Sequence, residues 1–231
     1  MAATGACALH ATASRSTLLV RMAGSTTMDT IQTVALAAGL SWASGIRLYA
    51  ALFVVGLGGA LGWITLPHDL QALSHPLVLT VTALMLLAEF FADKVPGLDS
   101  LWDAFHTFVR VPAGALLALG AVGHENTPQA IAAALLGGAL ATGTHLTKAG
   151  SRALINTSPE PFSNWAASFS EEALVLAILW AAFAHPGLLF VLLGAFVLLM
   201  LWLTPRIVSG ISAVLRKIGE LLGGSPPAPA K

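Results

Sequence analysis

The sequence is poor in charge. Only 10% of its 231 residues are Asp, Glu, Lys or Arg, and 56% are hydrophobic, whereas a soluble domain carries about 25% charged residues. A chain with so few charges cannot cover a water-facing surface, so lipid must be the solvent for most of its length. The composition excludes an ordinary soluble domain and predicts a membrane protein that contacts membrane lipid.

The sequence also lacks the residues that several common chemistries need. Its one cysteine, Cys7, can form neither an intrachain disulfide nor a cysteine-based metal cluster. Eleven basic residues balance eleven acidic ones, so there is no positive excess for binding nucleic acid. The seven histidines lack metal-ligand spacing, and no GxSxG, HExxH or Walker-type loop occurs. We therefore expect no metal, no cofactor and no nucleic-acid partner, and enzymatic activity is the less favoured reading.

Long apolar stretches are what the sequence does contain. Six of them stand out, at about 33–61, 77–92, 111–123, 129–146, 173–184 and 187–203. A stretch of thirteen residues makes about 20 Å of helix, against a bilayer core of about 30 Å. The short stretches must therefore extend into their polar flanks. This pattern predicts an all-α, polytopic membrane bundle of about six transmembrane helices.

The distribution of basic residues predicts an orientation. With the N-terminus inside, ten of the eleven Lys and Arg residues fall in cytosolic segments, and the outside connections hold none. The eleventh, Arg47, lies inside the first stretch. We expect both termini in the cytosol.

We divide the chain into a disordered tail at 1–28, a transmembrane bundle at 29–204, an interfacial amphipathic helix at 205–222 and a disordered Pro-rich tail at 223–231.

Two weak internal similarities suggest a repeat. Residues 43–48 resemble residues 141–146, in stretches of opposite direction, which would suit an inverted repeat of the transporter kind. Residues 96–104 match residues 159–167 at four positions, in segments of the same direction, which would suit a parallel repeat. The sequence leaves both arrangements open.

Polar residues gather in and beside the apolar stretches. Asp99, Asp103, His106 and Arg110 are spaced i, i+4, i+7 and i+11, so on a helix they fall within a stripe about 60° wide. A solvated face is the alternative reading of that stripe. The complete set of candidate binding residues is Arg47, Glu89, Asp93, Lys94, Asp99, Asp103, His106, Arg110, His145, Lys148, Asn164 and Glu171. For Lys148, and for Arg152 beside it, an anchoring role at the inner membrane surface is the simpler interpretation.

Arg47 is the most costly residue of this set. A guanidinium within a membrane helix costs about 2.5–3.5 kcal/mol unless it is paired, so we expect it to pair with a carboxylate across the bundle. Contact with Glu89 requires that the first helix be broken near Ser44-Gly45, or that the amphipathic helix from residue 98 tuck inward. Otherwise Glu89 should pair with Arg110, Lys148 or Arg152, and Arg47 with backbone carbonyls or water.

Two motifs carry a resemblance to a known family. At ASGIRLYAAL (43–52) and DKVPGLDSLWDAFHTFVR (93–110), the chain resembles a bacterial membrane family known as domain of unknown function 4126, over about residues 28–204. The resemblance implies a multi-pass protein of the bacterial inner membrane and implies no activity.

Three functional classes remain open from the sequence. Ionisable residues within short spans favour a small permease or channel for a small solute or ion. A non-transporting scaffold or assembly protein is the alternative, and an enzyme acting on lipid head groups with the Asp99, Asp103 and His106 stripe is the third. The sequence does not decide whether the protein forms a homo-oligomer.

Overall fold

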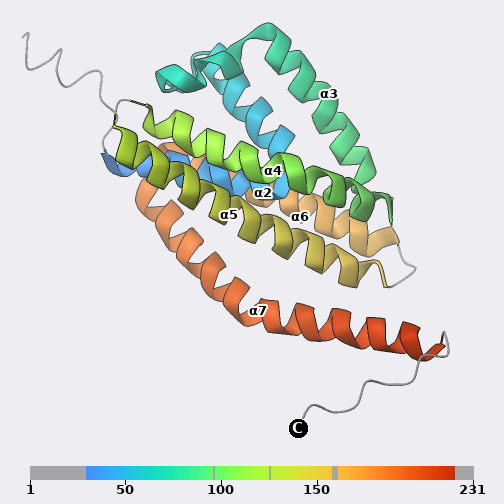
Figure 1. Ribbon diagram of the computed structural model, residues 1–231. Coiled ribbons are helices and arrows are strands. Elements are labelled where there is room, and N and C mark those ends of the chain that lie inside the picture. The colour runs from blue at the N-terminus through green and yellow to red at the C-terminus, as the bar shows by residue number, and fades with distance from the viewer. Residues whose placement is uncertain (1–29, 96, 125, 158–160, 222–231) are drawn as a thin grey trace, which may run out of the picture.

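The computed structural model describes residues 30–221, except 96, 125 and 158–160 (Figure 1). This part of the chain contains helices and no strand. In order, the helices are α2 (Thr30–Ala60), the short 3-10 helix η1 (His68–Ser74), α3 (Pro76–Ala92), α4 (Leu98–Val122), α5 (Thr127–Ile155), α6 (Pro161–Ala184) and α7 (Pro186–Leu221). The two tails expected at 1–28 and 223–231 lie outside the described residues.

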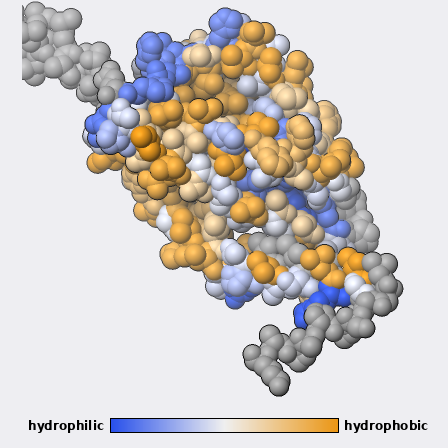
Figure 2. Space-filling view, viewed as in Figure 1, coloured by the Kyte–Doolittle hydropathy of each residue, from blue (hydrophilic) through white to orange (hydrophobic). Residues whose placement is uncertain are grey.

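The helices have the length and composition of membrane spans. Five of them, α2, α4, α5, α6 and α7, are long and apolar enough to cross a bilayer, and η1 with α3, bent by 67°, makes a sixth if the pair counts as one span. Hydrophobic residues cover most of the visible face in Figure 2. The all-α membrane bundle predicted from the sequence is confirmed.

Small residues allow α2, α4 and α5 to pack closely. A Cβ at Gly114 of α4 would overlap the Ala141 side chain of α5, and a Cβ at Gly45 of α2 would overlap Thr144 of α5. Without water between helices, such close backbone approach is the main source of membrane helix association. The last contact also brings together the two similar segments 43–48 and 141–146.

Helix α2 is broken at Arg47, whose φ of −141° and ψ of 84° are not helical. The residues before the break form a first arm (30–46), and those after it form a second arm (48–60). In the first arm, the Gln32 Nε2 donates to the Phe183 carbonyl, near the C-terminal end of α6. In the second arm, Gly58 borders a groove together with Phe183 and Ala184 of α6. Both arms therefore run from Arg47 toward the same end of α6.

This end of the bundle carries the α4–α5 connection, and we call it the turn end. Thr30 lines a groove there with Val122 and Gln129, on either side of that connection. The opposite end carries Leu98, Ile155 and Pro161, where α4 begins, α5 ends and α6 begins, and we call it the loop end. The two arms of α2 separate toward the turn end in Figure 1, one in darker and one in lighter blue.

The break overturns one expectation from the sequence. Residues 33–61 were predicted to cross the bundle once, which would place both described ends of the chain on one side. Instead α2 starts and finishes at the turn end, while α7 runs past Met200, beside Gly143, and Gly210, beside Leu154, toward the loop end. The physical reason is the non-helical backbone at Arg47, which reverses the chain.

Helix α7 also differs from the division drawn from the sequence. It continues without interruption through Pro205, so residues 205–221 form its C-terminal part rather than a separate helix. A proline inside a helix removes one backbone hydrogen bond and bends the helix, and α7 changes direction part-way along its length in Figure 1. The interfacial position of this segment stays a prediction.

Candidate functional site

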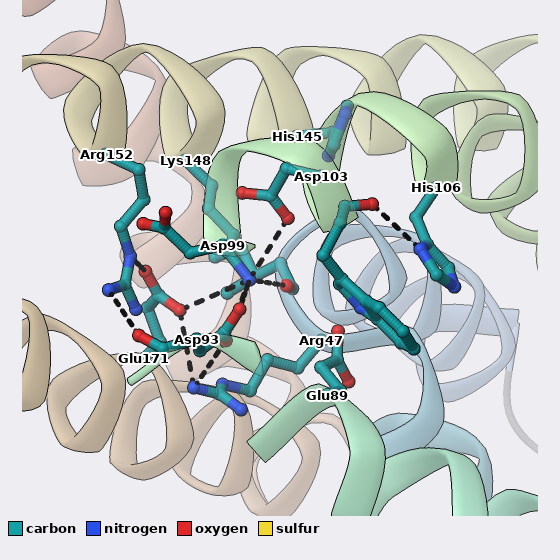
Figure 3. A network of polar contacts seen from close by, with 12 residues as sticks. Arg47, Glu89, Asp93, Asp99, Asp103, His106, His145, Lys148, Arg152 and Glu171 are labelled. Carbon is teal, nitrogen blue, oxygen red and sulfur yellow. Dashed lines mark hydrogen bonds and ion pairs between the residues drawn. The ribbon is translucent and has the colours of Figure 1, made fainter. Parts of the chain in front are cut away.

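The structure brings the twelve candidate residues into one largely buried region, which we call the polar core. Figure 3 shows its centre, with Arg47, Asp93 and Lys148 among the labelled residues. Arg47, Glu89, Asp93, Asp99 and Arg110 have no exposed surface, and Asp103, His106, His145, Lys148 and Asn164 are buried as well. The side chain of Glu171 is 14% exposed, and Lys94 is partly buried. The solvated-face reading of the α4 stripe is therefore wrong.

Helical spacing explains why these residues meet. On α4, the stripe from Asp99 to Arg110 faces inward. On α6, Asn164 and Ser168 are one turn apart and both fully buried, and Glu171 follows at i+7 from Asn164. Because charged groups in a membrane protein avoid lipid and pair with each other, these faces pack together at the broken part of α2.

Arg47, at the break, binds carboxylates from two other segments. Its Nη2 lies 2.8 Å from the Asp93 Oδ2, just after α3, and also donates to the Ser168 Oγ at 2.7 Å. The Nη1 atom lies 3.4 Å from the Glu172 Oε1 on α6. The expected pairing of Arg47 with a carboxylate across the bundle is confirmed, although Glu89 is not the partner.

Lys148 of α5 lies among the carboxylates and joins the parts of the polar core. Its Nζ is 3.2 Å from Asp93, 3.4 Å from Glu171 and 3.5 Å from Asp103. Dashed lines converge on this nitrogen in Figure 3. An ammonium held by three carboxylates of three different segments is part of the site, beyond the anchoring role that the sequence favoured.

Arg110 of α4 holds two carboxylates. Its Nη2 donates to Glu89 of α3, and its Nη1 donates to the Asp103 Oδ1 at 2.7 Å. From the sequence, Glu89 was expected to pair with Arg110, Lys148 or Arg152 if it did not contact Arg47. Its partner in the structure is Arg110.

Hydrogen bonds fix the state of His145. Its Nδ1 lies 3.2 Å from the Arg110 Nη1, and because a guanidinium can only donate, this Nδ1 must accept. Its Nε2 lies 2.7 Å from the Thr107 Oγ1, which itself donates to the Asp103 carbonyl. These contacts favour a neutral His145 with its proton on Nε2.

His106 lies at the edge of the polar core. Its ring stacks on Trp102 with 4.2 Å between centroids, its Nδ1 donates to the Trp102 carbonyl, and its Nε2 is 3.2 Å from the Tyr49 hydroxyl. Among the described residues it forms no ion pair with a carboxylate, so the acid–base pair that the lipid-enzyme hypothesis requires is not assembled.

Asp99 and Lys94 are held mainly by uncharged groups. The Asp99 carboxylate accepts from the backbone amides of Gly97 and Ser100 and from the Asn156 side chain. Lys94 Nζ lies 3.0 Å from the centre of the Phe90 ring, donates to the Phe90 carbonyl and reaches the Ser168 Oγ at 3.3 Å.

The candidate set omitted several residues that complete the site. Arg152 of α5 is fully buried and binds Glu171 at 2.9 Å and the Asn164 side chain. Its signal was in the spacing, since His145, Lys148 and Arg152 follow at i, i+3 and i+7 on one helix face. Ser168 lies at i+4 from Asn164 on the same helix face, and this spacing was its signal. Glu172, Asn156, Thr107 and Tyr49 carried no signal in the sequence.

Two grooves of the molecule lie away from the polar core. One of about 480 Å³ lies between the first arm of α2, α4 and α5 at the turn end, and one of about 610 Å³ lies between the second arm and α6. Both have mainly apolar linings and neither reaches Arg47. Within the described ranges, no group of three His, Cys, Asp or Glu side chains is arranged to hold a metal ion.

The chain also matches the model of a known protein family. The family model described as domain of unknown function (DUF4126) matches residues 34–206, which include every helix that contributes to the polar core. The chain belongs to the DUF4126 family. No curated protein and no solved structure matches this DUF4126 protein at a significant level. The family carries no assigned activity, so function has to be argued from the polar core.

Proposed function

We propose that this DUF4126 protein is a small permease of a bacterial inner membrane, and that a small solute or ion passes through its polar core. The observation that carries the proposal is the break of α2 at Arg47, which places a guanidinium and non-helical backbone among ion pairs from four other segments.

Membrane physics supports this reading of the break. Non-helical backbone at membrane depth is tolerated only where protein buries it or where it lines a polar path. Transporters build their sites in this way, with interrupted helices whose ends point at the substrate or coupling ion. In a purely structural bundle, apolar side chains could fill the same volume at a lower free-energy cost. The presence of many buried charges therefore favours a functional role.

The ion pairs form a continuous chain from a partly exposed residue to a buried one. Glu172, with 26% of its side chain exposed, contacts Arg47, and the chain continues through carboxylates and cations in alternation. Its further members are Asp93, Lys148, Asp103, Arg110 and Glu89. Neither of the two grooves described above reaches Arg47. We therefore take this structure to be the closed state of the permease, which must open during transport.

A non-transporting assembly protein is the second candidate. The dense pairing of the polar core, with both described grooves remote from it, is the observation that favours this alternative. A rigid core of that kind would stay inaccessible to water throughout.

Accessibility of the polar core to a water-soluble thiol reagent distinguishes the permease from the assembly protein. In a Cys7→Ser background, Ser168→Cys places a thiol beside Arg47 with little change in volume. His68→Cys, at a side chain 94% exposed, is the reactive control, and Ala182→Cys, at a fully buried apolar position, is the unreactive control. A permease predicts that Ser168→Cys in membrane vesicles reacts faster than Ala182→Cys from at least one side. Equal protection of both from both sides would contradict the permease and favour the assembly protein.

A further inference from the structure

Among the described residues, the polar core has one more carboxylate than it has cations. The ionisable groups connected in it by ion pairs and hydrogen bonds, other than histidines, are the cations Arg47, Lys94, Arg110, Lys148 and Arg152 and the carboxylates Glu89, Asp93, Asp99, Asp103, Glu171 and Glu172. His145 is neutral, so it adds no charge. An unbalanced negative charge in a buried site is costly unless a cation binds there.

Glu89 is the carboxylate with the least compensation. Asp93 contacts both Arg47 and Lys148, and Asp103 contacts both Arg110 and Lys148. Glu171 and Glu172 each pair with a cation and are partly exposed to solvent. The carboxylate of Asp99 accepts several hydrogen bonds. In the part of the chain that the structure describes, Glu89 pairs with Arg110 alone, which it shares with Asp103.

The second oxygen of Glu89 is unoccupied. Its side chain is fully buried, and among the described residues its Oε2 has no hydrogen-bond partner. The Oδ2 of Asp103, the other carboxylate on Arg110, is buried and unpartnered in the same way. Two carboxylates on one guanidinium, each with a free oxygen, form a site in which one negative charge can be neutralised at little structural cost.

A proton fits this site better than a metal ion. Ordered metal sites use several oxygen, nitrogen or sulfur ligands around one point, and the described residues contain no cluster of three side chains able to supply them. A proton needs only one carboxylate oxygen.

We infer that Glu89 binds one exchangeable proton and that this proton is the coupling ion of the proposed permease. The inference deepens the proposed function and rests on it. In the step, a proton from water adds to the free Glu89 oxygen and makes a neutral carboxylic acid, and the reverse step returns the proton to water. Arg110 then has Asp103 as its sole charged carboxylate.

Charged and titratable groups of five segments lie around the Glu89–Arg110 pair. From α2 they are Arg47 and Tyr49, from α4 Asp103, His106 and Arg110, from the end of α3 Asp93, from α5 His145 and Lys148, and from α6 Glu171. Glu172, at the other end of the ion-pair chain, has 26% of its side chain exposed, so that end of the polar core borders solvent. The guanidiniums in the chain cannot release a proton, so the proton reaches Glu89 by water when the site opens.

Infrared difference spectroscopy on the full chain in liposomes tests the proton site. The wild type, stepped from low to high pH, should lose the carbonyl band of a protonated, buried carboxyl group. Glu89→Gln, which resembles the protonated state in shape and charge, should lack that change. Asp69→Asn, which removes an exposed carboxylate remote from the polar core, should keep it.

Several outcomes would overturn the inference. These are the absence of the band in the wild type, its persistence in Glu89→Gln, or a shift of the titration with sodium concentration, which would make a metal cation the occupant. If Glu89→Gln fails to fold, Glu89→Asp must shift the frequency of the band, and an unshifted band would overturn the inference equally.

The proposed function can fail separately. If Ser168→Cys is protected from both sides while the Glu89 band titrates, the proposal of a permease is wrong. The proposed coupling role of the proton then fails as well, but Glu89 remains a proton-binding site. If Ser168→Cys reacts and no Glu89 band titrates, the permease stands without a proton at Glu89.

Discussion

Lys148 Nζ lies 3.2 Å from the carbonyl oxygen of Ile46, the last residue of the first arm of α2. The carbonyls at a helix C-terminus lack partners within the helix and carry a partial negative charge. The ammonium of Lys148 satisfies one of them while it also binds Asp93 at 3.2 Å. One side chain of α5 thus stabilises the broken end of α2 and fixes it to the residue after α3.

Removal of this charge should destabilise the protein strongly. Lys148→Met keeps most of the side-chain volume but leaves Asp93 and the Ile46 carbonyl without their cation, and breaking a buried pair costs about 3–5 kcal/mol. We expect a clear drop in thermal unfolding temperature in detergent. Lys217→Met, at an exposed position of α7, should change it little. Similar drops in both variants would contradict the role assigned to Lys148.

Gly45 should tolerate no side chain. A Cβ there would overlap the Thr144 hydroxyl and the Ala141 backbone carbonyl of α5, and overpacking of this kind costs about 1–3 kcal/mol or more. We expect Gly45→Ala to lower the unfolding temperature. Gly187→Ala is the matched control, because no atom lies within 4 Å of its added Cβ and alanine favours a helix by up to about 1 kcal/mol. A neutral Gly45→Ala would show that α2 and α5 are further apart.

The reversal of α2 predicts an unusual topology. Cysteines placed at Thr30 and His124 should be labelled from one side of the membrane, and a cysteine at Arg216 from the other, in a Cys7→Ser background. The reason is that Thr30 lies at the turn end beside the α4–α5 connection, while α7 runs to the loop end. Labelling of positions 30 and 216 from the same side would restore the single-span reading of α2.

The contact between η1 and the α4–α5 connection should depend on pH. Asp69 accepts from His124 at 2.7 Å and from His68 at 3.2 Å, and these side-chain hydrogen bonds lower the pKa of Asp69. A carboxyl group with a lowered folded-state pKa stabilises the fold above its unfolded pKa, and this contribution disappears as the pH falls through the folded pKa. Hydrogen exchange at the amide of Leu70 should therefore accelerate, relative to its intrinsic rate, at acid pH. Asp69→Asn should show no such step.

The sequence predicted the membrane class, the helical architecture and most of the polar core. Charge scarcity and apolar length decide the class, because a bilayer permits few other folds. The spacing of Asp99, Asp103, His106 and Arg110 predicted one helix face correctly, since 3.6 residues per turn is a property of the helix itself.

From the sequence, a break of the first helix near Ser44-Gly45 was only a condition for contact between Arg47 and Glu89, and it was not predicted outright. The segment 43–48 contains a glycine but no proline, and the contacts that stabilise the break come from residues far along the chain, such as Lys148 and Ser168. The sequence therefore placed Arg47 inside a single continuous helix, whereas it lies where the chain reverses. Arg152 was assigned to the membrane surface because the general bias of basic residues toward the cytosol concealed its role.

The reversal of α2 also constrains how the protein can be made. The hydrophobic segment of α2 leaves the ribosome before those of the later helices, but the carboxylates that neutralise Arg47 lie at positions 93, 171 and 172. Until α6 has been synthesised, the guanidinium has at most one of these partners, and holding it in lipid alone costs several kcal/mol. The two arms of α2 must therefore reach their final position late, by rearrangement after insertion, and a chain terminated before α6 should leave its first hydrophobic segment spanning the bilayer or held at its surface.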